Sequence, residues 1–285
     1  MPKVRGILKK RQHKAKPDYR RSKTPPKQKS ENKCELEYKL PSDLKMLLER
    51  SLKTSDKVNS GLYLNRYVGF DSNGKSEISE QCALKMLKSP DMYPFFLKKQ
   101  ESLFQSMKDA GYHGDSFGYT LKSRMIVGLG GESVYETSIT LHRNLGVPYI
   151  PGSALKGIAN HYGMDTEYRN MDKLFGTQSE QETKEKGKAV FFDAFPVTDA
   201  GNNIFEIDIM NPHYSDYYSE GKPPGDWMKP IPIKFLTVKK GTEYRFYITS
   251  TDENLLNDAI NLLKGALKEN GVGAKTSLGY GRFVF

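Results

Sequence analysis

The chain has 285 residues, 37% of them apolar and 11% aromatic, enough to bury the core of one large domain or two small ones. It contains no apolar run of about 18 residues and no apolar stretch typical of a signal peptide near its start, so we expect neither a membrane span nor export. The two cysteines, Cys34 and Cys82, indicate neither a disulfide framework nor a thiolate metal site, and they favour a cytoplasmic location.

Residues 1–33 form a strongly basic segment. They contain thirteen Lys or Arg and two acidic residues, a net charge of +11, whereas the whole chain carries +10. Few large apolar residues and several prolines occur here, so the segment is predicted to be a disordered tail. Basic tails of this kind usually bind polyanions such as nucleic acid, and a solubilising extension is the alternative.

Residues 34–116 are predicted to form an N-terminal helical extension packed on the core. Leucines at helical spacing predict a helix over 43–53, and residues 61–70 have the pattern of an extended segment. Further helices are expected over 78–88 and, more firmly, over 93–110.

From residue 117 onward the predicted elements follow the order β-α-β-β-α-β with insertions. One helix begins at Ser153, another covers 166–175, and a third follows a capping box at 250–253 and ends at Asn270. The predicted strands cover residues 117–127, 189–195, 204–210, 231–238, 243–249 and 279–285. This order indicates an α+β fold over 117–285 with a ferredoxin-like (RRM-like) core, and sheets of this kind often carry RNA.

The last fifteen residues combine four glycines with cationic and hydroxyl side chains. Glycine lets the backbone approach a ligand closely, and bare amides beside such side chains suit anionic oxygens. A strand follows the glycines, which excludes the Walker and Rossmann phosphate loops, because both lead into a helix. The segment therefore predicts a phosphate-binding turn, and the start of a bulged strand is the alternative. The candidate residues are Gly271, Gly273, Lys275, Thr276, Ser277, Gly279, Gly281 and Arg282.

A second candidate anion site precedes the helix that begins near Ser153. Gly152 would let a phosphate come close, and Ser153 would cap the helix, whose first amides point outward. Lys156 lies in the first turn, where a cation is unfavourable unless an anion is nearby, and Gly157 follows it. A plain serine cap with a solvated lysine is the alternative.

Histidines are the only candidates for proton transfer. His142 and His161 flank the second anion site, so either is a candidate general acid or base, although a packed or surface histidine is the simpler interpretation. The five histidines show no metal spacing, and no Ser-His-Asp or paired-acid motif occurs. We therefore expect no catalytic residue, no metal and no cofactor.

The elements at 151–157 and 271–283 resemble the two signatures of the RAMP superfamily, the ferredoxin-like RNA-binding proteins of CRISPR systems. Stretches at 136–142, 174–176 and 211–218 make the chain similar, within that superfamily, to the sixth subunits of type III-B (Cmr) effector complexes. The resemblance covers the region from 117 onward well and 58–116 loosely, and it does not account for the basic tail.

This resemblance implies a non-catalytic subunit that binds guide RNA and caps the helical backbone near the 3′ side of the guide in antiviral defence. Its partners would be guide and target RNA and other Cmr subunits. His142 and Arg143 join the RNA-binding candidates on this basis. Related subunits that cut target RNA carry an aspartate after their first strand, whereas the corresponding loop here, 128–150, contains Glu132 and Glu136 but no aspartate.

Two other hypotheses remain open. One is a metal-independent ribonuclease that processes CRISPR precursor RNA, with His142 or His161 as general base and Lys156 stabilising the transition state. The other is a structural protein whose glycine-rich turn docks against a neighbouring subunit.

Overall fold

The computed structural model describes residues 37–54, 58–70, 76, 84, 87–177, 185–197, 203–211, 215–225, 227 and 230–284. They belong to one compact unit, Cys34–Phe285. The basic tail, residues 1–33, and most of the helix expected over 78–88 lie outside the described residues. In the described part of the chain, no helix combines the length and the apolar character needed to cross a membrane.

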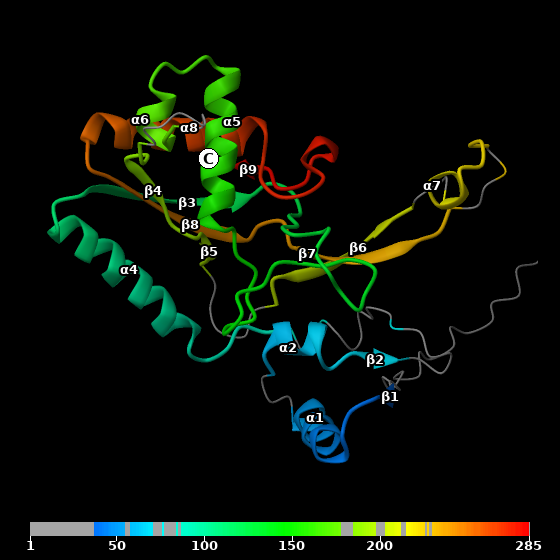
Figure 1. Cartoon of the computed structure of the whole chain (residues 1–285). Coiled ribbons are helices and arrows are strands. Elements are labelled where there is room, and N and C mark those ends of the chain that lie inside the picture. The colour runs from blue at the N-terminus through cyan, green and yellow to red at the C-terminus, as the bar shows by residue number, and fades with distance from the viewer. Residues whose placement is uncertain are drawn as a thin grey trace, which may run out of the picture. The chain divides into compact units, whose positions relative to one another are not determined.

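An antiparallel sheet forms the centre of this unit (Figure 1). Its strands lie in the order β4-β8-β3-β9, and β5 also pairs with β8. The longest pairing joins β3 to β8, from His113 opposite Ser250 to Thr120 opposite Glu243. The strands are β3 (His113–Leu121), β4 (Ala189–Phe191), β5 (Phe195–Pro196), β8 (Glu243–Ser250) and β9 (Phe283–Val284).

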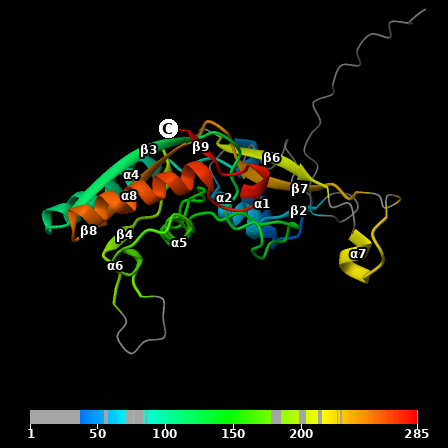
Figure 2. The same cartoon turned by 90° about the horizontal axis from the view of Figure 1, so that it is seen from above.

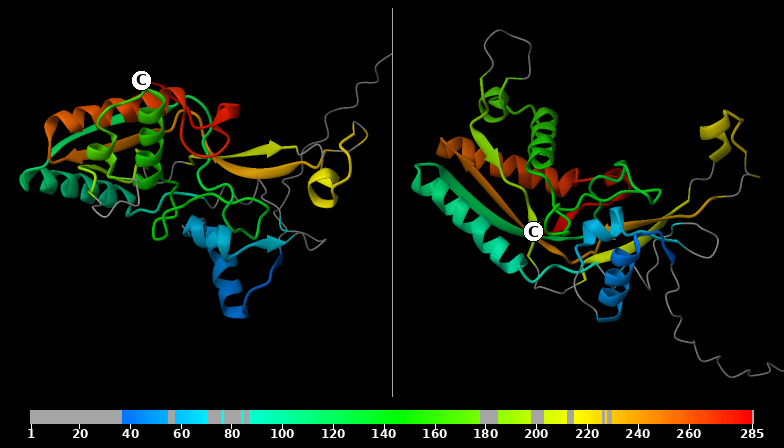
Figure 3. Two further views of the ribbon diagram at one scale, coloured as in Figure 1. Left: turned by 45° about the horizontal axis from the view of Figure 1, so that its top comes forward. Right: turned by 60° about the horizontal axis from the view of Figure 1, so that its bottom comes forward.

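Helices cover both faces of the sheet. Helices α5 (Gly152–Asp165) and α8 (Glu253–Glu269) lie on one face and α4 (Tyr93–Asp109) on the other (Figure 3). The alternation of side chains along β8 explains this arrangement, because successive residues of a strand point to opposite faces. Phe246 and Ile248 are buried in the core beneath α8, whereas the ring of Tyr247 lies 4.9 Å from that of Phe104 on α4.

Helix α8 forms as its sequence predicts. Eight apolar residues at helical spacing are buried. The cap is Asp252, whose carboxylate accepts from the amides of Asn254 and Leu255, rather than Ser250 of the predicted capping box. Ser250 is instead the last residue of β8, where it is buried and paired with both β3 and β4.

Elements inserted into the core include a separate two-stranded arm. Strands β3, β4, β8 and β9 with helices α5 and α8 follow the order β-α-β-β-α-β, and α6 (Met171–Phe175) follows α5. Between β5 and β8 the chain forms an antiparallel pair, β6 (Phe205–Met210) and β7 (Ile233–Val238), with α7 (Ser215–Glu220) between them. We call β6 and β7 the arm.

The N-terminal elements pack against the base of the arm. They are β1 (Glu37–Tyr38), α1 (Ser42–Thr54), α2 (Ser60–Asn65) and β2 (Gly69–Phe70). Buried residues of α1, α2 and both arm strands, among them Leu48, Tyr63 and Leu236, form one apolar cluster. The prediction of an extended segment over 61–70 is wrong for its first half. The side chain of Asn59 accepts from the amides of Gly61 and Leu62 and so starts a helical turn there.

Candidate nucleic-acid interface

The glycine-rich segment at 271–282, which we call the terminal loop, is fixed by backbone hydrogen bonds. It joins α8 to β9 and lies against the segment that follows β3 (Figure 2). The strand predicted over 117–127 ends at Leu121. Beyond it, Lys122, Arg124 and Ile126 pair with the terminal loop, and Met125 pairs with Val238. Three bonds of 2.8 Å connect the two segments: Gly281 amide to Arg124 carbonyl, Ala274 amide to Ile126 carbonyl, and Lys122 amide to Arg282 carbonyl.

Two glycines of the terminal loop are required by contacts within the protein. A Cβ on Gly273 would lie 2.2 Å from the carbonyl oxygen of Ile126, and one on Gly281 would lie 1.9 Å from that of Val272. Both glycines have positive φ, 96° and 67°. The expectation that these glycines make room for a ligand is therefore corrected, since the room is taken by the chain's own backbone. The exposed Gly279, in contrast, has open space around it.

The surface of the terminal loop is a short 3₁₀ turn, Thr276–Leu278, which carries several donors. Lys275 precedes it in a left-handed conformation, with φ of 59°. Among the described residues, no backbone carbonyl accepts from the amides of Lys275, Thr276 or Ser277. The half-buried Lys275 and the exposed Ser277 belong to the same turn, so its amides, a hydroxyl and an ammonium group are the donors that it can offer to an anionic oxygen.

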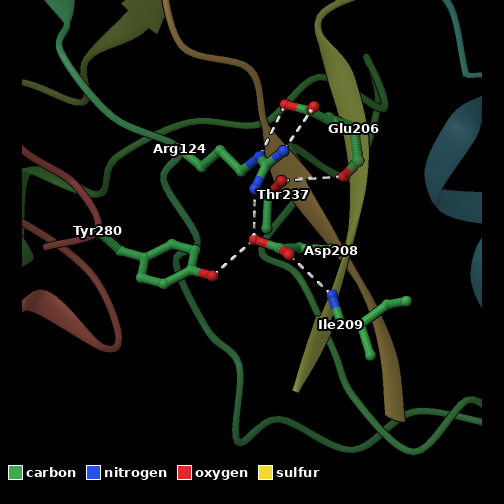
Figure 4. Close-up of polar contacts among 6 residues, drawn as sticks. All are labelled: Arg124, Glu206, Asp208, Ile209, Thr237 and Tyr280. Atoms are coloured by element: carbon green, nitrogen blue, oxygen red, sulfur yellow. Dashed lines mark hydrogen bonds and ion pairs between the residues drawn. The ribbon is translucent and has the colours of Figure 1, made fainter. Parts of the chain in front are cut away.

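A polar network anchors the terminal loop to the arm (Figure 4). The hydroxyl of Tyr280 donates to Asp208 Oδ2 at 2.6 Å. Arg124 donates to the same oxygen at 2.9 Å and makes a two-bond contact of 2.8 and 2.9 Å with Glu206. Both carboxylates project from β6. The network thus joins the terminal loop, the segment after β3 and the arm.

The charges of this network are stabilised by one another. Burial alone would raise the pKa of Asp208, but hydrogen bonds from Tyr280, the Ile209 amide and Arg124 outweigh it and lower that pKa. The hydrogen bond from Arg124 lowers the pKa of Glu206. Burial and the contact with Asp208 raise the pKa of Tyr280 to about 12. Since two carboxylates neutralise Arg124, it adds no net positive charge to the surface.

Arg124, Glu206 and Asp208 are not among the site residues expected from the sequence. The alternation of acidic and apolar residues along 205–210 is the one available signal, because it indicates a strand with an acidic face. Their partner Arg124 lies 82 and 84 positions away, a separation that no local pattern reveals.

The start of α5 differs from the prediction. The helix begins at Gly152 with Pro151 in the capping position, so Ser153 is not the cap. The Gly152 amide donates to Asp193 Oδ1 at 2.7 Å, and a Cβ on Gly152 would lie 2.2 Å from the carbonyl oxygen of Phe191. A carboxylate of the protein itself therefore occupies the place that was predicted for a phosphate at the first amide.

The remaining candidates of this segment share one helical face. Ser153, Lys156 and Gly157 are three and four residues apart, Ser153 and Gly157 are exposed, and Lys156 is half-buried. Helix α5 and the terminal loop lie on the same side of the sheet as α8 (Figures 1 and 2). Their polar contacts go to different neighbours: the start of α5 contacts Asp193, whereas the terminal loop contacts Arg124, Ile126 and Asp208. Within the terminal loop, an Arg282 nitrogen donates to the Thr276 carbonyl at 3.4 Å, and the buried Gly271 packs on Gly281.

The histidines occupy unrelated environments. The ring of His142 packs among Phe96, Tyr149 and Phe195, with centroid distances of 5.3 to 5.9 Å. Burial lowers its pKa and the charge of Asp193 acts in the opposite direction, so His142 contributes no full positive charge at neutral pH. Its neighbour Arg143 is exposed.

His161 lies on the surface of α5, where its Nε2 is 3.6 Å from the carboxylate of Asp165, one helical turn further on. Within the part of the chain that the structure describes, no group of three or more His, Cys, Asp or Glu side chains is arranged to hold a metal ion.

Comparison with known protein families identifies the family of this chain. The RAMP superfamily pattern matches residues 119–284, more than half of the chain, including β9, α5 and the terminal loop. The chain belongs to the RAMP superfamily. The resemblance seen in the two glycine-containing signatures is therefore confirmed.

Two curated proteins and one solved structure are similar to this chain. Cmr6 of the CRISPR system of Pyrococcus furiosus is 36% identical over 261 residues, which cover 69% of this chain and 74% of that protein. Cmr6 of Saccharolobus solfataricus is 27% identical over 187 residues, which cover 64% of this chain and 62% of that protein.

The solved structure is the type III-B Cmr-β complex bound to cognate target RNA, determined by cryo-electron microscopy. One of its chains matches with a TM-score of 0.56 and 25% identity, and the match covers 66% of this chain and 64% of that one. This chain thus spans less than two thirds of the second relative and of the solved chain. The RAMP protein described here is a homologue of Cmr6.

Proposed function

We propose that this RAMP protein is the guide-RNA-binding subunit that caps the helical backbone of a type III-B CRISPR effector complex, near the 3′ side of the guide. Its homology with Cmr6 supports membership of such a complex. Its likeness to a chain of a Cmr complex bound to target RNA supports contacts with RNA and with other Cmr subunits. The cytoplasmic location expected from the cysteine content remains a prediction.

The observation that carries the proposal is the terminal loop. Its backbone is held rigidly against the segment after β3, while the amides around Lys275 and the hydroxyl of Ser277 remain free to bind a ligand. Such a turn binds phosphates without reading bases, which is what a subunit needs if it must accept guides of any sequence. We assign Lys156 and Ser153 on α5 as the second part of the interface, because α5 and the terminal loop lie on the same side of the sheet.

We propose that the core has the ferredoxin-like arrangement. The way helices cover the two faces of its sheet then determines where RNA can bind. The strand order β4-β8-β3-β9, with both helices of the β-α-β-β-α-β unit on one face, supports that assignment. RRM proteins stack bases on the opposite face of such a sheet. Here α4 packs on that face through Phe104, which contacts Tyr247 and Phe192. We therefore assign RNA to the terminal loop and the start of α5 rather than to the sheet.

We infer that the subunit does not cut RNA. Among the described residues, His142 Nδ1 has no hydrogen-bond partner, so no hydrogen bond at this nitrogen prepares the ring for proton transfer. His161 is paired with Asp165 on an exposed helical face. The purified chain should leave CRISPR repeat RNA intact in EDTA. A discrete product that disappears in the His142→Ala variant would establish the ribonuclease hypothesis instead.

A salt titration of RNA binding tests the interface. For single-stranded nucleic acid, log affinity falls against log salt with a slope of about −0.7 per neutralised phosphate. Replacing both Lys156 and Lys275 by Ala should weaken guide-RNA binding and reduce the steepness of this slope by about 1.4. Removing two exposed lysines of α4, Lys98 and Lys99, provides the control, since α4 lies on the other face of the sheet. The assignment is wrong if the Lys156 and Lys275 variant keeps the affinity and slope of the wild-type protein.

A further inference from the structure

A groove between α2 and the loop at 132–143 has the chemistry of a second RNA contact. The cavity has a volume of about 740 Å³, within the range of natural ligand sites. Its lining combines the exposed apolar side chains of Leu62 and Val134 with the polar side chains of Ser138 and Thr140. None of these four residues belongs to the interface described above.

The walls of the groove are locked together by Asn59. While its side-chain oxygen caps α2, its side-chain nitrogen donates to the carbonyls of Arg143 at 3.3 Å and Asn144 at 3.0 Å. Gly146 then packs against α2 so closely that a Cβ there would lie 2.6 Å from the Ser60 amide. The two walls of the groove, α2 and the loop, are therefore fixed relative to each other.

Two arginines give the groove its charge. Arg66 at the end of α2 and Arg143 on the loop both line it and are both exposed. Neither forms an ion pair with any other described residue, and Glu132 is the one acidic residue in the lining. Guanidinium groups without a carboxylate partner suit phosphate, to which they bind in a two-bond geometry.

The groove is continuous with the terminal loop through backbone hydrogen bonds. The terminal loop binds the carbonyl of Ile126, as described above, and the carbonyl of the next residue, Val127, accepts from the Thr140 amide at 2.7 Å. The Ser138 amide donates to the carbonyl of Leu129 at 3.3 Å. Thr140 and Ser138 both line the groove. Paired backbone thus leads from the terminal loop to the wall of the groove that carries Arg143, whereas Arg66 lies on the other wall, at the end of α2.

We infer that the groove binds a phosphodiester of the single-stranded guide RNA, adjacent to the stretch held by the terminal loop. Arg66 and Arg143 contact the phosphate, and Leu62 and Val134 offer an apolar surface to the neighbouring sugar or base. This inference rests on the proposed function, because it extends the path of the same RNA. RNA fits better than a protein partner, because the two exposed arginines have no carboxylate partner among the described residues and the wall that carries Arg143 is joined by backbone hydrogen bonds to the terminal loop.

RNA oligonucleotides of increasing length test the groove. In fluorescence anisotropy, an Arg66→Gln, Arg143→Gln variant should bind long single-stranded RNA about tenfold more weakly than the wild-type protein, because charge-assisted hydrogen bonds are lost. Its salt slope should be less steep by about 0.7, the value for one neutralised phosphate. Oligonucleotides too short to extend beyond the terminal loop should bind both proteins equally. Arg66→Lys with Arg143→Lys should restore most of the slope, and Glu132→Gln should tighten binding.

Matched variants make the outcomes separable. Arg169→Gln removes an exposed arginine beyond the C-terminal end of α5 and should have no effect. If the wild-type protein binds no guide RNA, the proposed function itself fails. If it binds, and the Lys156 and Lys275 variant is weakened while the Arg66 and Arg143 variant matches wild type at every length, the groove inference alone is overturned. It is also overturned if the arginine variant loses assembly with other Cmr subunits in the absence of RNA but keeps full RNA affinity.

Discussion

Replacing Gly281 by Ala should collapse the terminal loop. The new Cβ would lie 1.9 Å from the carbonyl oxygen of Val272, and the backbone has φ of 67°, which costs a non-glycine residue about 1–2 kcal/mol. Relieving this overlap breaks two hydrogen bonds. In one, the Val272 amide donates to the Gly281 carbonyl at 3.0 Å, and in the other, the Gly281 amide donates to the Arg124 carbonyl at 2.8 Å. At about 1 kcal/mol for each bond, the total loss of stability is about 3–4 kcal/mol.

Gly279→Ala is the matched control in the same loop. Gly279 has φ of 94° and nothing within 4 Å of an added Cβ, so only the backbone cost of about 1–2 kcal/mol applies. Urea unfolding with an unchanged m-value should therefore separate the variants by about 2 kcal/mol, and their Tm values by about 4–8 °C. Guide-RNA affinity should fall in Gly281→Ala and persist in Gly279→Ala. Equal losses of stability in the two variants would refute the claim that Gly281 is required by backbone packing.

Three further perturbations test other parts of the structure. Tyr280→Phe should cost about 1 kcal/mol and raise the pKa of Asp208, measured by NMR titration, because the hydroxyl that stabilises the carboxylate is gone. Since the folded pKa of Asp208 lies below its unfolded value, its contribution to stability is present above about pH 4 and lost as pH falls through the folded pKa. Tyr280→Phe should reduce this acid-dependent loss, and an unchanged pH profile of unfolding would contradict the role of the network. Asp193→Asn removes a charge from the start of α5, so it should lower stability by about 0.3–1 kcal/mol, lower the pKa of His142 and tighten RNA binding. If NMR titration gives His142 the same pKa in this variant and in the wild-type protein, the charge of Asp193 does not act on the His142 ring. Deleting residues 1–33 should leave the circular dichroism spectrum of the folded unit intact and weaken binding to non-guide RNA, whereas equal affinity would make the tail a solubilising extension.

The sequence predicted best where local signals and burial agree. Helix α8 has eight buried apolar residues at helical spacing, and the predicted strands at 204–210, 231–238 and 243–249 occur nearly as expected. In these elements the periodicity reflects packing against a large core, so the pattern and the tertiary structure favour the same conformation.

The predictions failed where a distant residue decides the local structure. Ser153 looks like a cap, but the carboxylate that binds the start of α5 comes from Asp193, 41 positions away. The strand expected to reach residue 127 ends at Leu121, because the terminal loop pairs with the residues that follow. Gly273 and Gly281 are predicted to meet a phosphate, but the surface that requires glycine at both positions is the chain's own backbone. Which glycine meets a ligand and which meets the protein depends on contacts that the spacing of residues does not encode.

The pairing of the terminal loop with residues 122–126 has a consequence for synthesis. Gly281 binds Arg124 across 157 positions of sequence, so the two halves of the interface leave the ribosome at widely separated times. The segment after β3 must wait for translation to reach β9 before its amides and carbonyls find their partners. A nascent or prematurely terminated chain therefore lacks the turn at Lys275 in its folded form, and with it the surface to which we assign RNA.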